Sequence, residues 1–147
     1  MSDPLYRRDL LRLAADAHGA GRLRQPDATG EAFNPACGDR VTVNILLAGG
    51  RISDLAHETK ACVLAQASAS ILGSALRGAD CAEVAALHAR VSAMLAAGEN
   101  PPAAPFEAYG LFEGAVEYAS RHRCVLLPIE AVLDALHRSV ASDERSA

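Results

Sequence analysis

The chain of 147 residues contains no tryptophan, a single lysine and few aromatic residues, which make up 4% of the total. Its core must therefore be built from aliphatic side chains, since half of the residues are apolar. No apolar run approaches the roughly 18 residues that span a bilayer. The opening residues Met1–Arg8 also lack the apolar stretch of a secretory signal. We expect a cytoplasmic protein with no membrane partner.

The chain also has fewer basic than acidic residues. The net charge is −4, which argues against sequence-independent binding to nucleic acid. The sequence shows no repeat of solenoid length and no low-complexity linker. The chain is long enough to bury a hydrophobic core without disulfides or a structural metal. We expect one domain over residues 1–147 and no nucleic-acid partner.

The strand pattern is clearest in the middle of the chain. Apolar residues alternate from Val41 to Leu47, which is typical of a half-buried strand. Gly49 and Gly50 provide a turn, and residues 51–59 can return as the hairpin partner. A third strand is predicted at residues 31–34. Together with the helices around it, this hairpin indicates an α+β fold, a small antiparallel β-sheet packed by helices on one side.

Four helices are predicted around this sheet. The first spans Leu5–Ala17, and the second, rich in alanine and serine, spans Val63–Leu76. Asp80 and Glu83 form a capping box at the start of the third helix, which Gly98 ends. The fourth helix is expected to begin close behind Cys124, because Pro128 fits only a first helical turn.

The four cysteines form no CxxC pair, and in a reducing cytoplasm such spacing indicates burial, metal binding or catalysis rather than disulfides. Cys37 lies in a Pro/Gly loop before the first clear strand, and Cys62 and Cys124 precede predicted helices. Helix N-termini favour the thiolate form, so we expect lowered thiol pKa values at Cys62 and Cys124. Cys81, at the start of the capped helix, is interpreted as a small core residue.

Asp39, two residues beyond Cys37, can turn its carboxylate toward the same centre. Three thiolates and one carboxylate suit tetrahedral zinc or iron. The spacing alone matches no local metal motif, however, and leaves open the alternative of scattered structural cysteines. Among the histidines, His122 is the one whose position, two residues before Cys124, would let it reach such a site.

Three segments resemble the U-type iron–sulfur cluster assembly scaffold family, which comprises IscU, SufU and the N-terminal domain of NifU. Asn34–Asp39 (N-P-A-C-G-D) is similar to the family's first-cysteine loop, and Cys62–Ser70 to its second-cysteine helix with the A-S-A-S sequence. Arg121–Cys124 (R-H-R-C) resembles the R-x-K-C of SufU-type members. The long stretch between the second and third cysteines also favours the SufU type.

This resemblance implies the SufE/IscU-like scaffold fold. It also implies that Cys37, Asp39, Cys62 and Cys124 hold Zn²⁺, iron or a transient [2Fe–2S] cluster. The implied partners are a cysteine desulfurase of the SufS type and downstream apo iron–sulfur proteins. Cys37 and Cys124 are the candidate acceptors of persulfide sulfur.

The resemblance favours a non-enzymatic scaffold for iron–sulfur cluster assembly. Two alternatives use the same four ligands: a zinc-dependent sulfurtransferase that never holds a cluster, and a structural zinc adaptor domain. The ligands carry four negative charges, of which one Zn²⁺ or an oxidised [2Fe–2S] core offsets two. We expect basic neighbours to moderate the remainder and to keep the thiol pKa values low; they are Arg40, Lys60, Arg121 and Arg123.

Overall fold

The computed structural model describes residues 7–146. Leu5, where we expected the first helix to begin, lies outside the described residues. The elements along the chain are α1 (Arg8–Asp16), β1 (Ala28–Asn34), β2 (Asp39–Ala48), β3 (Arg51–Lys60), α2 (Val63–Ala75), α3 (Cys81–Ala97), the 3-10 helix η2 (Glu107–Ala115) and α4 (Ala119–Ser146).

The three strands form one antiparallel sheet in the order β1-β2-β3. The predicted hairpin is therefore confirmed, and the predicted third strand is longer than expected. Along β2, Val41, Val43 and Ile45 are buried while Thr42 and Asn44 face outward, as the alternating pattern requires. The sheet thus has one apolar face and one polar face.

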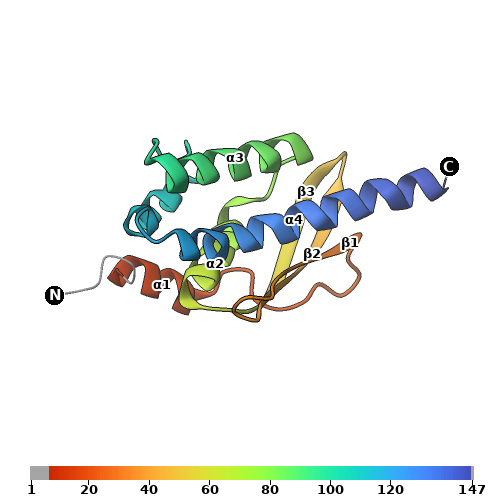
Figure 1. The fold of residues 1–147 in the computed structure, drawn as a ribbon. Helices are drawn as coiled ribbons and strands as arrows, with labels where there is room; N and C mark the ends of the chain where they lie inside the picture. Colours follow the sequence, from red (N-terminus) through yellow and green to blue (C-terminus); the bar gives the residue numbers. More distant parts are fainter. Residues whose placement is uncertain (1–6, 147) are drawn as a thin grey trace.

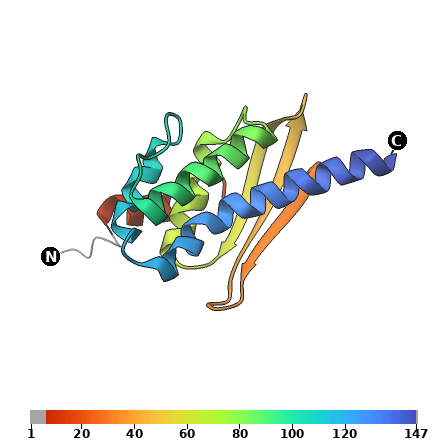
Figure 2. The same ribbon diagram turned by 45° about the horizontal axis from the view of Figure 1, so that its top comes forward.

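The helices cover the apolar face alone. Helix α2 contacts β3, and α4 lies across β1 and β2 (Figure 1). Helix α3 packs on α4, and α1 packs against α2. Figure 2 shows α4 crossing the sheet and extending beyond its edge. The predicted α+β fold with helices on one side is confirmed. Among the described residues, no helix is both long enough and apolar enough to cross a membrane.

The predicted third helix is also found. The Asp80 side chain accepts a hydrogen bond from the Glu83 amide at 2.9 Å, and Gly98 ends the helix with a φ of 67°. Behind this cap, Val84, Leu87 and Val91 are buried in the core, as their spacing predicts.

The predicted start of the last helix is wrong. Helix α4 begins at Ala119, five residues before Cys124, and Pro128 lies in its interior. The prediction relied on the rule that proline is excluded from helix interiors, but packing against other elements can overcome that penalty. Sequence reasoning also missed η2, which connects α3 to α4.

A glycine brings β1 into close contact with α4. A Cβ atom on Gly30 would lie 2.2 Å from the Ala135 nitrogen and 2.3 Å from the Ala131 oxygen. Both neighbours are backbone atoms, so no side-chain rotation would relieve the overlap. A hydrogen bond also connects β1 to α4 next to this contact: the Glu31 amide donates to Asp134 Oδ2 at 2.9 Å.

Replacing Gly30 by alanine should therefore separate β1 from α4. We expect Gly30→Ala to lower the free energy of unfolding by about 1–3 kcal/mol, measured by denaturant titration. Gly110→Ala is the matched control, because its Cβ would meet only Pro101 side-chain atoms at 3.4 Å. That control should stay within about 0.5 kcal/mol of the wild type. Equal losses in the two variants would contradict the assigned contact.

Candidate metal centre

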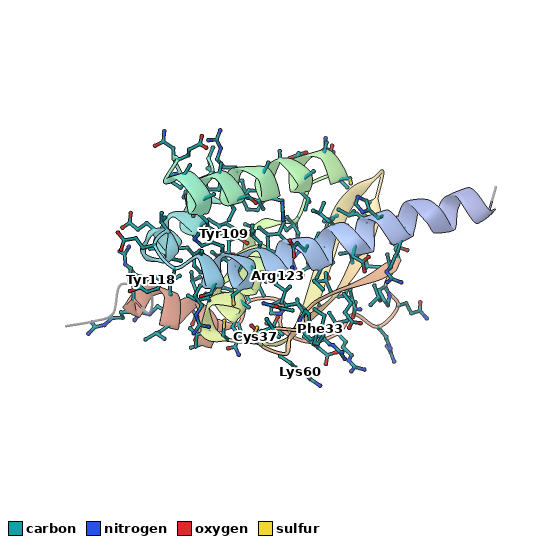
Figure 3. All side chains as sticks on the ribbon, viewed as in Figure 1. Phe33, Cys37, Lys60, Tyr109, Tyr118 and Arg123 are labelled. Carbon is teal, nitrogen blue, oxygen red and sulfur yellow. The ribbon has the colours of Figure 1, made fainter. Side chains whose placement is uncertain are left out.

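Three chain segments meet at one end of the sheet. Strand β2 starts at Asp39, and its next residue, Arg40, pairs with Lys60 at the end of β3. Cys62, two residues past Lys60, is therefore carried to the start of β2. Helix α4 reaches the same end, where Arg123 Nη2 donates to the Phe33 carbonyl at 3.3 Å. Figure 3 shows Cys37 and Lys60 near this end, with Phe33 and Arg123.

The turn between β1 and β2 presents Cys37 and Asp39. The Asn34 carbonyl accepts from the amides of Cys37 and Gly38 at 3.3 and 2.8 Å. The Asn34 side chain accepts from the Ala36 amide at 3.2 Å, which is an Asx turn. Gly38 has a φ of +75°, which glycine adopts without strain. Sequence reasoning missed this role of Asn34, although an Asn-Pro pair marks a turn.

Three predicted ligands lie together. The Sγ atoms of Cys37 and Cys124 and a carboxylate oxygen of Asp39 are all within 4.8 Å of one another. Cys124 Sγ is 3.7 Å from Asp39 Oδ2. Two ligands on one tetrahedral zinc ion at about 2.3 Å are roughly 3.7 Å apart. The donor types and their separations therefore fit a single metal ion after a small closure of the turn.

These three residues differ in accessibility. Cys37 is exposed at the tip of the turn, whereas Asp39 and Cys124 are 8% and 2% exposed. The cluster is therefore open to solvent and to a partner through Cys37 and closed on its inner side.

Cys62 occupies the N-cap position of α2, as predicted, and is half-buried. It is outside the mutual cluster of the other three ligand atoms but faces Cys124. Its thiol pKa is lowered to about 6, chiefly because Cys124 donates a hydrogen bond to it. The backbone amides of Ala65 and Leu64 at the start of α2 lower this pKa further. The expected lowering of the Cys62 pKa is thus confirmed, with the amides of the helix terminus contributing less than Cys124.

The expectation of a lowered pKa at Cys124 is wrong. Because α4 starts at Ala119, Cys124 lies beyond the first turn and away from the free amides. Its pKa is raised, first because its proton is held in the hydrogen bond to Cys62, and then by burial and nearby negative charge. The two thiol pKa values are thus shifted in opposite directions, down at Cys62 and up at Cys124, while the Cys124 thiol also contacts Asp39 Oδ2.

Cys81 and His122, which were also considered from the sequence, are not part of the cluster. Cys81 is half-buried at the start of α3 and packs against the hydrophobic core. His122 directs Nε2 to the carbonyls of Ala115 and Val116, at 2.9 and 3.1 Å. This histidine joins α4 to η2 rather than reaching the thiols.

Two of the four basic neighbours, Arg40 and Arg123, bind groups other than the thiols. The Arg40 guanidinium pairs with Glu31 at 3.0 Å and lies 5.1 Å from the centre of the Phe33 ring. Arg123 also binds Phe33, through its carbonyl. Phe33 is 43% exposed, and sequence reasoning missed it. The lowered pKa of Cys62 arises from thiol and amide hydrogen bonds rather than from these cations.

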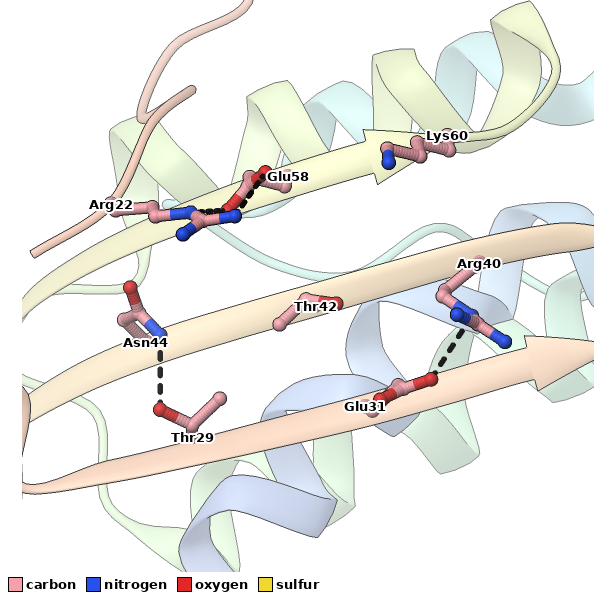
Figure 4. Close-up of a pocket in the computed structure, with 8 residues that line it drawn as sticks. All are labelled: Arg22, Thr29, Glu31, Arg40, Thr42, Asn44, Glu58 and Lys60. Atoms are coloured by element: carbon pink, nitrogen blue, oxygen red, sulfur yellow. Dashed lines mark hydrogen bonds and ion pairs between the residues drawn. The ribbon is translucent and has the colours of Figure 1, made fainter.

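A separate polar pocket of about 320 Å³ lies on the outer face of the sheet (Figure 4). Arg22 binds Glu58 there, Arg40 pairs with Glu31, and Asn44 donates to Thr29 Oγ1 at 3.0 Å. The charged groups of this pocket are largely paired with one another, and no thiol lines it. The candidate metal-binding and sulfur-accepting groups therefore lie at the end of the sheet and not in this pocket.

Comparison with known proteins identifies relatives of this chain. Residues 5–125 match the model of the NifU-like N terminal domain family. The chain is 29% identical over 122 residues to the iron–sulfur cluster assembly scaffold protein IscU of Streptococcus pyogenes serotype M1, covering 83% of this chain and 76% of that protein. It is 25% identical over 142 residues to the zinc-dependent sulfurtransferase SufU of Bacillus subtilis (strain 168), covering 97% and 93%.

Among solved structures, the chain is similar to a nitrogen-fixing NifU-like protein (N-terminal) from Brucella abortus. The TM-score is 0.88 and the sequence identity 33%, over 95% of this chain and 96% of the other. The arrangement of the sheet and helices described above is therefore the fold of that protein.

The shifted pKa values of Cys62 and Cys124 predict how fast each thiol reacts with an alkylating agent as the pH changes. In the metal-free protein, alkylation of Cys62 should have a midpoint near pH 6, since its lowered pKa leaves it as the thiolate above that pH. Cys124→Ala removes the proton donor and should move this midpoint up toward the usual value of about 8.5. The modified cysteine is identified by mass spectrometry.

Cys81→Ala, distant from the pair, should leave the Cys62 midpoint unchanged. An unshifted midpoint in Cys124→Ala would show that the amides of α2 alone set the pKa of Cys62.

Proposed function

Since this chain belongs to the family of NifU-like N-terminal domains, we propose that it is an iron–sulfur cluster assembly protein. It holds iron or a nascent cluster as cargo and accepts sulfur from a cysteine desulfurase. The observation that carries the proposal is the convergence of Cys37, Asp39 and Cys124 from two distant chain segments at an open end of the sheet, with Cys62 of a third segment interacting with Cys124.

The proposed ligands are Cys37, Asp39, Cys62 and Cys124. Cys62, the thiolate at the start of α2, anchors the metal, and Cys124 joins it after losing its proton. Metal binding should therefore release a proton from the thiol pair. Asp39 is a weaker ligand for soft metals than a fourth thiolate, which suits a centre that must release its cargo.

Cys37 is the proposed first acceptor of sulfur because it is the exposed thiol of the set. Its thiolate attacks the outer sulfur of a persulfide on the desulfurase cysteine. A new S–S bond forms at Cys37 as the S–S bond in the donor breaks, and the donor cysteine leaves as a thiolate. The sulfur changes partners with no external oxidant or reductant. Cys124, buried behind it, is the second candidate.

A second candidate function is a zinc-dependent sulfurtransferase, and the relatives include both kinds of protein. In that case the same four residues would hold Zn²⁺ as a resident cofactor, whose positive charge would keep the bound thiols deprotonated. A structural zinc adaptor is the third candidate. It predicts that chelators remove the metal only as the fold is lost.

The ligand set is tested by serine substitutions. Cys37→Ser, Cys62→Ser and Cys124→Ser should each abolish tight metal binding, because each removes one thiolate from a four-ligand site. Cys81→Ser is the matched control and should keep the wild-type metal content. The measurement is the ratio of metal to protein after anaerobic purification. Equal loss in the Cys81 variant would refute the assignment.

The function itself is tested by anaerobic incubation with a cysteine desulfurase, cysteine and ferrous iron. An assembly scaffold should gain iron and acid-labile sulfide with visible charge-transfer bands. A zinc sulfurtransferase would retain zinc and carry a persulfide without gaining iron. In either case Cys37→Ser should lose the persulfide that mass spectrometry detects. A protein that gains neither sulfur nor iron would contradict the proposal and favour the structural zinc domain.

A further inference from the structure

Helix α4 contains a break in its hydrogen-bond ladder at the residue that carries the buried thiol. In an α-helix the amide of one residue donates to the carbonyl four residues earlier. Pro128 has no amide hydrogen, so it cannot donate to the carbonyl of Cys124. The turn of α4 that carries Cys124 is therefore joined to the rest of the helix by one bond fewer than usual.

A side chain from another helix bonds to the adjacent carbonyl. Ser68 of α2 donates its hydroxyl hydrogen to the Val125 carbonyl at 2.7 Å, and Ser68 is fully buried. The Ser68 oxygen lies 2.8 Å from the Tyr109 hydroxyl of η2. Because the one Ser68 proton is used toward Val125, the Tyr109 hydroxyl is the donor to Ser68, with the Ser68 hydroxyl oxygen at 2.8 Å and the Ser68 carbonyl oxygen at 3.3 Å as its acceptors. A chain of two hydrogen bonds thus runs from η2 through α2 to α4; Figure 3 labels Tyr109 at its η2 end.

Two other lateral bonds of this turn, those of Arg123 and His122, are less protected. Arg123 reaches the Phe33 carbonyl at the surface, and the bonds of His122 are only partly buried. Tyr109 is fully buried, as Ser68 is. Hydrogen bonds are stronger in such a low-dielectric interior than at the surface. The pair of Ser68 and Tyr109 is therefore a buried lateral attachment of the Cys124 turn, beside the contact of Cys124 Sγ with Asp39 Oδ2.

We propose that Ser68 and Tyr109 are positioning residues for the metal centre. They hold the Cys124 turn of α4 in the place where Pro128 has removed a helical bond. This inference rests on the proposed ligand role of Cys124. The consequence is that the distance between Cys124 Sγ and Asp39, 3.7 Å here, depends on a hydroxyl that touches neither residue.

The test compares two buried serines of the same helix. Ser68→Ala should weaken zinc binding roughly 10- to 100-fold, the loss typical of residues that orient metal ligands. Tyr109→Phe should act in the same direction. Ser70→Ala is the matched control, because Ser70 is equally buried but accepts from the His18 amide at 3.0 Å, away from α4. Zinc affinity is measured by competition with a chromophoric chelator.

A second readout needs no metal. In the metal-free protein, Ser68→Ala should speed amide hydrogen exchange in residues 121–127 relative to residues 131–138, and Ser70→Ala should not. A merely destabilised fold would speed exchange in both segments alike. This readout separates failure of the inference from failure of the proposed function. If the wild-type protein binds no zinc, the ligand assignment fails, and the exchange pattern still decides whether Ser68 holds the turn.

Restoring the helical bond should make the serine dispensable. Pro128→Ala supplies an amide that can donate to the Cys124 carbonyl. In that background the loss of zinc affinity caused by Ser68→Ala should shrink severalfold, which a double-mutant cycle measures. Equal losses in the Ser68 and Ser70 variants would overturn the inference. A Ser68 effect of the same size with and without Pro128 would overturn it as well.

Discussion

The contact between Gly30 and α4 sets the position of the metal centre, because it fixes how far the helix can slide along the sheet. Gly30 meets the backbone at Ala131 and Ala135. From Gly30, strand β1 runs four residues to Asn34, about 13 Å at the rise of a strand. From the middle of that contact, α4 runs back nine residues to Cys124, again about 13 Å at the rise of a helix. Strand and helix therefore reach the same end of the sheet together.

At that end, the chemistry is divided among residues with different exposure. Cys37 is presented to solvent by a turn that Asn34 stabilises, whereas Cys124 is enclosed beneath it. The pKa of Cys62 is lowered and that of Cys124 is raised, so Cys62 is the thiol of this pair that ionises more readily before any metal arrives. An exposed acceptor in front of a prepared thiolate is the arrangement that sulfur delivery followed by cluster assembly requires.

Structural features that depend on neighbouring residues could be predicted from the sequence. Features that depend on contacts between distant segments could not. The capping box at Asp80 and the alternation in β2 depend on neighbouring residues, and both predictions are confirmed. The start of α4 was predicted wrongly, because α4 is held by contacts with segments distant in the sequence, such as the bond from Ser68 to the Val125 carbonyl. The expected lowering of the Cys124 pKa failed partly for the same reason, and the pKa is raised by Cys62, by burial and by nearby negative charge. The four ligand candidates came from the motifs, since their spacing alone matched no metal site.

We propose above that Cys37, Asp39, Cys62 and Cys124 bind one metal ion together. X-ray absorption at the zinc edge of the zinc-loaded protein tests it most directly. Four-ligand binding should give three sulfur neighbours at about 2.3 Å and one oxygen neighbour at about 2.0 Å. The oxygen neighbour should be lost in Asp39→Cys. A site with fewer than three sulfur neighbours, or with four sulfur neighbours in the wild-type protein, would contradict it.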